Sequence, residues 1–222
     1  MSTCPSNDVT ICELRQLIEG KSPSTTWLRK LFLTLTRVHM SSAANYGDLA
    51  EELAGLVWSA TEVNGRLAVS LTSPAGPMIS SGQIPGVYVN VGQLNYSGDV
   101  NGDVEGDTED NALRVLTTRA SSMVQLVCLH TDADASANLG NTLLAFFQSI
   151  KGFLGTLGIF GFTPDSMMGP DTKKAGDTTY YQTLVMFKYQ FHQRVTVSLG
   201  GHKLRGISFN IKKEGDVLLE PL

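Results

Sequence analysis

The alternation of large side chains near the carboxyl end constrains the fold of this chain more than any other feature. Every second residue there shares one face of the pattern, namely Tyr181, Thr183, Val185, Phe187, Tyr189 and Phe191. A period of two is that of a β-strand, whose successive side chains point to opposite sides. The other face is apolar at Leu184 and Met186 and becomes polar at Lys188, Gln190 and His192. The pattern therefore predicts a long strand that is buried on both faces at one end only.

Further strands are predicted wherever apolar residues alternate or β-branched residues gather. These runs lie around residues 67–71, 87–91, 113–129, 195–199 and 207–211. Within them, Met123–Leu129 has the composition of a strand buried on both faces. Gly200–Gly201 indicates a turn between the last two runs. The segments Asn95–Asn111 and Pro164–Gly176 are predicted as loops.

Helical spacing of apolar residues marks four other segments. They lie around residues 11–18, 27–39, 49–57 and 139–154. Ser24, Thr25 or Thr26 can cap the second of these helices, and Thr131, Asp132 or Asp134 can cap the fourth. Apolar side chains of the fourth helix, among them Phe147, form a single stripe that predicts a face packed in the core.

The order of elements predicts the fold class. Helices come first, then strands, one long helix and further strands, which is the order of an α+β protein. We therefore expect a single domain with a largely antiparallel sheet packed by helices. Residues 1–45 are predicted as an N-terminal helical extension, and residues 46–222 as the α+β core.

Charge and cysteine content restrict the environment and the partners. The formal net charge is −4, which disfavours a protein that grips nucleic acid through its phosphates. Three cysteines without a Cys-x-x-Cys spacing predict reduced thiols, and hence assembly in a cytoplasm. The first residues have no signal-peptide pattern, and we expect no membrane-spanning segment because no apolar run is long enough.

Motifs for cofactors are near misses. Gly20-Lys21-Ser22 resembles the end of a phosphate-binding loop, but Arg15 stands where such a loop has glycine. The glycines at 152, 155, 158 and 161 follow a helix instead of opening one, which a dinucleotide site does not do. We predict a helix end that passes into a closely packed turn there, and neither a cofactor nor a metal site.

One cluster contains residue types that can perform nucleophilic catalysis. Cys128 and His130 share a face at the end of a predicted strand, and Asp132 and Asp134 follow. A thiol beside an imidazole is the arrangement of a cysteine-dependent hydrolase. The alternative interpretation is structural, because a free cysteine in an apolar run is usually a small buried hydrophobe and both aspartates can cap a helix. We predict no catalytic residues and keep the hydrolase as the alternative function.

An acidic segment is the most distinctive local feature. It contains Asp99, Asp103, Glu105, Asp107, Glu109 and Asp110, with no lysine or arginine among them. The EF-hand pattern fails because Val104 stands where that calcium loop needs glycine. A solvated loop and a cation site of another type both remain possible. The third hypothesis is a loop that lines a channel or contacts a basic partner.

The layout of the chain resembles that of the tail-terminator and neck proteins of long-tailed phages. The resembling region runs from Leu49 to Ile211. It comprises PGVYVNVG, then MVQLVCLHTDAD followed by ANLGNTLLAFFQSI, then YYQTLVMFKYQFHQRVTV and finally GISFNIK. The resemblance lies in the order of the elements and in the general character of their sequences, with no invariant motif.

The resemblance implies a structural role in the virion. Proteins of this family are small subunits that close into rings, usually six-fold, between head and tail. This chain would accordingly be a tail-terminator or neck subunit, a homohexamer that contacts the head connector and the tail-tube proteins after assembly in the host cytoplasm. DNA would pass without sequence-specific binding, with the Asp99–Asp110 segment as a candidate lumen or partner contact. An adaptor or stopper in the same neck is the alternative within this class.

Overall fold

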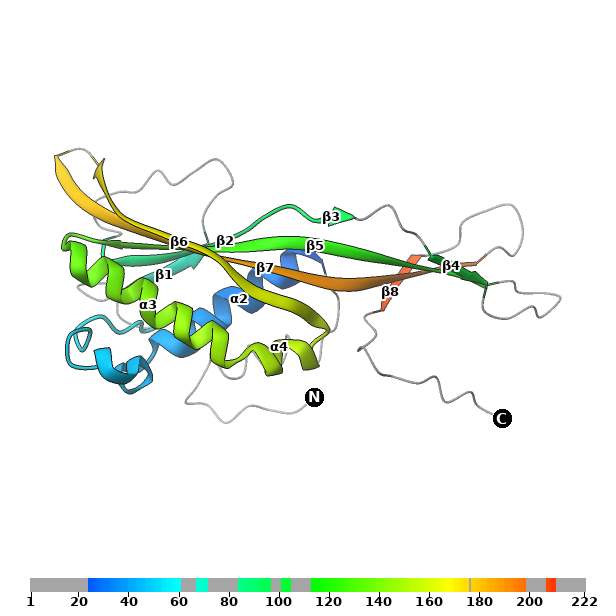
Figure 1. Cartoon of the computed structure of the whole chain (residues 1–222), viewed down its shortest axis with the longest axis horizontal. Coiled ribbons are helices and arrows are strands. Elements are labelled where there is room, and N and C mark those ends of the chain that lie inside the picture. Colours follow the sequence, from blue (N-terminus) through cyan, green and yellow to red (C-terminus); the bar gives the residue numbers. More distant parts are fainter. Residues whose placement is uncertain are drawn as a thin grey trace.

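One long twisted sheet, with helices packed on one of its faces, forms the body of the molecule (Figure 1). The computed structural model describes residues 24–60, 67–71, 84–96, 101–104, 113–175, 177–198 and 207–210. For residues 101–104, 113–118, 175, 192–198 and 207–210 it describes the backbone alone. The α+β fold expected from the sequence is confirmed.

The sheet has the strand order β1-β2-β5-β7-β6. Its strands are β1 (Ala68–Leu71), β2 (Gly86–Val91), β3 (Asn95–Tyr96), β4 (Asn101–Val104), β5 (Leu113–His130), β6 (Ile159–Ala175), β7 (Thr178–Ser198) and β8 (Ile207–Asn210). Strands β1 and β2 are parallel, and the other pairs are antiparallel. Strands β2, β3 and β4 follow one another along one side of β5. Strands β6 and β8 follow one another along the side of β7 that faces away from β5. The result is a long, narrow sheet centred on the β5–β7 pair.

The helices are α2 (Thr25–Met40), the 3-10 helix η1 (Ala43–Leu49), α3 (Ala133–Ser149) and α4 (Lys151–Thr156). The side chain of Ser24 accepts a hydrogen bond from the Trp27 amide, and Asp132 accepts one from the Ala135 amide. These are N-caps of the predicted types, which satisfy amides that the first helical turn leaves without partners. Helix α2 packs against β1 and β2, whereas α3 packs against β5, β6 and β7.

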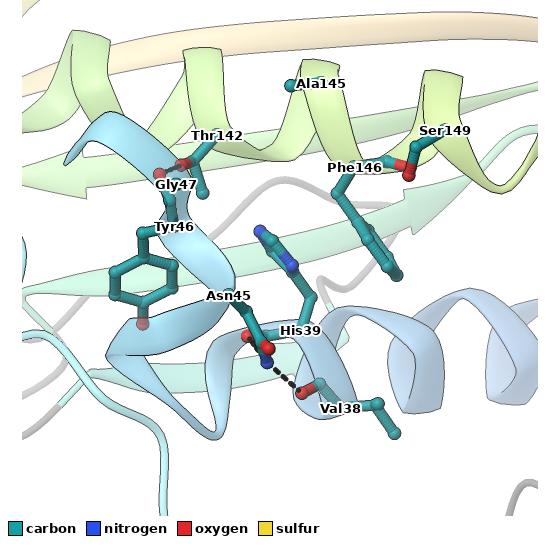
Figure 2. A pocket seen from close by; sticks show the side chains of 9 residues that line it. All are labelled: Val38, His39, Asn45, Tyr46, Gly47, Thr142, Ala145, Phe146 and Ser149. Carbon is teal, nitrogen blue, oxygen red and sulfur yellow. Dashed lines mark hydrogen bonds between the residues drawn. The ribbon is translucent and has the colours of Figure 1, made fainter. Parts of the chain in front are cut away.

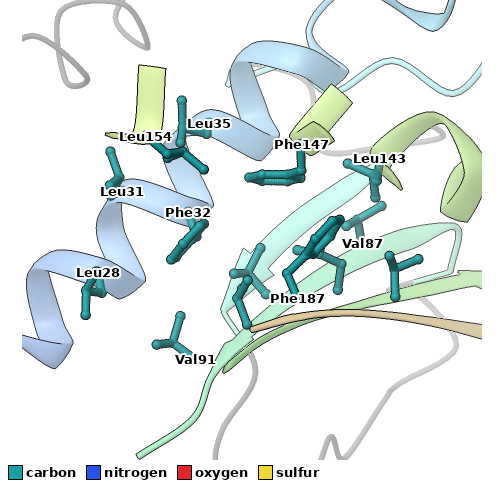
Figure 3. Close-up of a cluster of buried hydrophobic side chains, with 14 of the residues drawn as sticks. Leu28, Leu31, Phe32, Leu35, Val87, Val91, Leu143, Phe147, Leu154 and Phe187 are labelled. Carbon is teal, nitrogen blue, oxygen red and sulfur yellow. The ribbon is translucent and has the colours of Figure 1, made fainter. Parts of the chain in front are cut away.

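The core lies between this helical layer and the sheet (Figure 3). Phe147 of α3 is at its centre, with ring centroids 6.0 Å from Phe32, 5.5 Å from Phe187 and 6.1 Å from Phe162. These four aromatic side chains come from α2, α3, β6 and β7 and are fully or almost fully buried. Because α2 supplies part of this core, its residues belong to the same folded unit as the sheet. The boundary expected at residue 45 stays a prediction.

Gly140 lets α3 approach the sheet closely. A Cβ atom at this position would lie 2.7 Å from Cγ2 of Thr183 and 2.9 Å from Cε of Met167. We predict that Gly140→Val lowers the free energy of unfolding by about 1–3 kcal/mol, the usual effect of overpacking a core. Urea denaturation measures it, with Gly152→Ala as the control.

A Cβ atom at Gly152 of α4 would meet nothing within 4 Å. Gly152→Ala should therefore leave stability unchanged or raise it by up to about 1 kcal/mol, since alanine favours helix. Equal losses for the two glycine variants would contradict close packing at Gly140.

Most predicted elements are confirmed. Strand β7 spans the alternating run, with Phe187, Tyr189 and Phe191 buried and Lys188 exposed. Strand β5 is buried on both faces over Leu126–Leu129, although Met123 near its middle is only half-buried. The fourth helix is divided at Ile150 into α3 and α4. The helix predicted around residues 11–18 and the turn at Gly200–Gly201 lie outside the described residues.

Three local predictions were wrong. The segment Pro164–Gly176 was expected as a loop, but most of it belongs to β6, which accommodates Pro164 and Gly169–Pro170 through three register shifts against β7. The helix expected around residues 49–57 is instead a series of turns over residues 50–55 after η1, and the Leu56 carbonyl accepts from the Tyr46 hydroxyl rather than from a helical amide. The expected loop Asn95–Asn111 includes the short strands β3 and β4, because β5 is long enough to pair with them.

Candidate functional site

A pocket between α2, η1 and α3 is the candidate site (Figure 2). Its volume is about 420 Å³, within the range of about 300–1,000 Å³ that small ligands occupy. The lining residues are Val38, His39, Asn45, Tyr46, Gly47, Thr142, Ala145, Phe146 and Ser149. The lining contains no aspartate, glutamate, lysine or arginine, and His39 is its only residue that ordinarily titrates near neutral pH.

His39 is the chemically distinctive residue of this pocket. Its ring extends from α2 toward α3 and is stacked on Phe146, with centroids 4.2 Å apart and an interplanar angle of 13°. The side chain is only 5% exposed, and Nε2 is buried without a hydrogen-bond partner. Burial lowers the pKa of His39 from 6.5 to about 4, so the ring is neutral at physiological pH.

Neighbouring polar groups fix the end of α2 beneath the pocket. The Asn45 side-chain amide donates to the carbonyl oxygens of His39, at 2.9 Å, and of Val38, at 3.3 Å. The Tyr46 hydroxyl donates toward the carbonyls of Met40 and Leu56. These contacts satisfy carbonyl groups that a helix end leaves free, and they hold η1 against α2. Burial also raises the pKa of Tyr46 to about 12, so its hydroxyl stays protonated.

The structure does not assemble a catalytic pair from Cys128 and His130. Cys128 is fully buried in the main core, and burial raises its pKa to about 12. His130 Nδ1 already accepts a hydrogen bond from the Asp132 amide at 2.9 Å. Asp132 caps α3, and Asp134 lies exposed in the first turn of that helix. A thiol without solvent access and without a free neighbouring base is unsuited to nucleophilic attack.

We predict that Cys128 resists thiol reagents while the protein is folded. In a Cys4→Ser/Cys12→Ser background, labelling at about pH 8 should be roughly 100-fold or more slower than in the unfolded chain, because reaction requires an accessible thiolate. Mass spectrometry of quenched samples measures the rate. Rapid labelling of native protein would revive the hydrolase hypothesis.

Of the six acidic residues in this segment, the structure describes only Asp103, by its backbone, which pairs with Val115 in the β4–β5 ladder. The other predicted positions, Asp99, Glu105, Asp107, Glu109 and Asp110, lie outside the described residues. Their role as a lumen lining, partner contact or cation site stays a prediction. Within the described ranges, no group of three or more histidine, cysteine or acidic side chains could hold a metal ion.

A second, polar pocket of about 550 Å³ lies where β2 ends beside β5, β6 and β7. It is lined by Gly92, Gln93, Asn95, Ser121, Ser122, Met123, Gly161, Thr163, Lys188, Tyr189 and Gln190. The ammonium of Lys188 forms an ion pair with Asp165 at 2.5 Å, and Arg119 donates to the Gln190 side chain. Its principal cation already has an acidic partner, but the buried hydroxyl of Tyr189 in its lining has no hydrogen-bond partner, as is also the case for Nε2 of His39 in the first pocket.

The part of the chain that the structure describes contains no helix long and apolar enough to cross a membrane. No protein-family model matches the chain, and a search of curated proteins found no significant match.

Proposed function

We propose that this protein is a structural subunit that closes into a ring at the neck or tail end of a long-tailed phage. In this role it ends the tail tube and joins it to the head connector. The proposal is supported by the α+β layout and by a sheet that extends beyond the helices of the described residues.

The extended end of the sheet carries the proposal. Strands β5 and β7 continue past the helical layer as an arm, formed by residues 113–119 and 192–198 and flanked by β4 and β8 (Figure 1). No helix among the described elements packs on this arm. A thin ribbon of strands is marginally stable alone, because a sheet gains its stability by packing a face against another layer. In a ring, neighbouring copies supply that layer.

Two edge strands of the sheet, β1 and β6, have features that disfavour strand addition from another molecule. At β1, the Arg37 guanidinium donates two hydrogen bonds of 3.2 Å to the Val69 carbonyl. At β6, Pro164 and Pro170 lack amide hydrogens, and three register shifts interrupt the ladder. Such features block the pairing of edge strands between molecules. The proposed ring would therefore be closed by head-to-tail contacts that do not use these two edges.

The charge of the chain suits a passage for DNA. A net charge of −4 and the Asp99–Asp110 segment give a ring whose lumen repels the phosphate backbone, so DNA slides without being retained. In the alternative placement, this segment contacts a basic surface of the connector or tail tube.

Native mass spectrometry tests the assembly, and a charge variant tests the passage. The wild-type chain should form one defined oligomer, alone or with tail tubes, whose mass is an integer multiple of 23.9 kDa. Replacing the six acidic residues by their amides should leave folding and ring mass intact while reducing DNA delivery by assembled particles. A variant that unfolds would show a structural role for the segment, and a wild-type chain that stays monomeric on tails would contradict the proposed function.

A further inference from the structure

Charged side chains are unevenly distributed along the helical layer. Three basic residues lie toward one end of it, namely Arg29 and Lys30 in the N-terminal half of α2 and Lys151 at the start of α4. Neither α2 nor α4 contains an acidic residue. In Figure 1 this end of the layer is on the right, on the side from which the arm of the sheet projects. These three residues define the basic end of the layer.

The other end of the layer is acidic. It comprises η1, the turns that follow η1 and the first turn of α3, which lie together on the left in Figure 1. The Asn138 side chain of α3 donates to the Glu52 carboxylate at 2.5 Å and so ties the turns to this helix. No lysine or arginine occurs in residues 43–60 or in α3. The acidic end consists of the exposed residues Asp48, Glu51, Glu52 and Asp134.

The charges of the two ends are not paired within the part of the chain that the structure describes. No member of either end forms an ion pair there. Arg37, in the last turn of α2, already donates to the Val69 carbonyl and lies over the Trp58 ring, 5.0 Å from its centroid. Like charges that gather at one end repel one another. Each end is therefore stabilised when a surface of opposite charge covers it.

A second copy of the chain is the partner that fits both ends. The ends lie at opposite extremes of the helical layer, so they cannot neutralise each other within one molecule (Figure 1). A basic partner of another kind would cover the acidic end and leave the basic end uncovered, whereas successive copies cover both. The two surfaces in such a contact differ, which makes the contact head to tail. Since the basic end adjoins the arm, a copy docked there also lies beside the strands of the arm.

We propose that the acidic end of one copy docks on the basic end of the next and that this contact joins neighbours in the ring. The contact rests on the proposed function and supplies the residues of one interface within it. Exposed ion pairs are individually weak and are screened by salt, so several pairs must act together. For the wild-type chain, raising the NaCl concentration from about 0.05 M to about 0.5 M should therefore weaken association about 10-fold.

Reversal of charge at each end tests the contact, with self-association measured by sedimentation velocity, alone and with tail tubes. Two variants each reverse the sign of one end at exposed positions, namely Lys30→Glu/Lys151→Glu and Asp48→Lys/Glu51→Lys/Asp134→Lys. Glu52 is retained because it binds Asn138. Each variant should associate about 10-fold or more weakly than wild type, because both of its ends then carry the same sign. Circular dichroism verifies that each variant is folded.

An equal mixture of the two variants separates lost complementarity from damage to the fold. In the mixture, the negative ends of one variant meet the positive ends of the other, so association should return to within about 3-fold of wild type. Lys173→Glu/Lys174→Glu is the control. It lies on the hairpin between β6 and β7, changes the net charge as much as the first variant does, and should associate as wild type does.

Three results would each overturn this contact and leave the proposed function standing. They are wild-type affinity in both reversal variants, folded reversal variants that stay apart when mixed, and wild-type association that salt leaves unchanged. A wild-type chain that remains monomeric on tails contradicts both proposals.

Discussion

Phe147→Ala is expected to lower the free energy of unfolding by about 3–5 kcal/mol, the range for a large aromatic side chain removed from a core. Phe147 is completely buried, and its ring lies within 6.1 Å, centroid to centroid, of Phe32, Phe162 and Phe187. The variant leaves a cavity at the point where α2, α3 and the sheet meet. Chemical denaturation of wild type and variant measures the loss.

Phe153→Ala is the matched control for this prediction. Phe153 belongs to the same apolar stripe of the sequence, but in α4 its side chain is 36% exposed. Its removal should change stability by less than about 1 kcal/mol, as partly exposed positions usually do. Similar losses at the two positions would mean that the helical layer does not pack on the sheet as described.

Acid should destabilise the folded protein through His39. The pKa of this residue is about 4 in the folded state and 6.5 as the ordinary value, because burial disfavours the charged ring. Between these values the unfolded chain binds more protons, so the stabilising effect of the neutral ring is complete above pH 6.5 and is lost as the pH falls toward 4. Between about pH 7.5 and 5, wild type should lose ~2 kcal/mol more than His39→Leu does.

Denaturation curves over this pH range measure the effect, and Thr142→Val is the control. Thr142 lines the same pocket but does not titrate, so its replacement should shift stability equally at every pH. Parallel pH profiles for wild type and His39→Leu would show that the His39 ring is hydrated and can be protonated in the folded state.

Periodicity was sufficient to predict the central elements of the fold. The alternation from Tyr181 to Phe191 corresponds to β7, and the stripe through Leu139, Leu143 and Phe147 corresponds to the buried face of α3. The caps at Ser24 and Asp132 are each one of the three candidates that the sequence offered, because capping depends on residues within one turn. These features are local, or repeat over many residues, and so leave a pattern.

The errors arose where pairing between distant segments overrides local preference. Pro164, Gly169 and Pro170 indicate a loop by composition, yet β7 is long enough to hold them in β6 through bulges. In residues 49–57 the apolar spacing predicted a helix, and Leu53 within the segment is buried, but residues 50–55 form turns. The structure of such segments depends on contacts with residues that are distant in the sequence.

The candidate site was only partly visible in the sequence. His39 falls at the helical spacing of the apolar residues of α2, but no sequence pattern marked it as a site residue, because the pocket depends on residues from η1 and α3. The grouping of Cys128 and His130 was visible and suggested chemistry, yet burial of the thiol decides against it. The sequence could not distinguish the His39 pocket from the Cys128–His130 pair, because it does not show which side chains the core encloses.

Electron microscopy of the purified chain, alone and mixed with tail tubes, tests the central claim most directly. We expect closed rings with a central opening wide enough for duplex DNA, seated on the tube end when tubes are present. Images that show only single globular particles, both alone and on tail tubes, would contradict it.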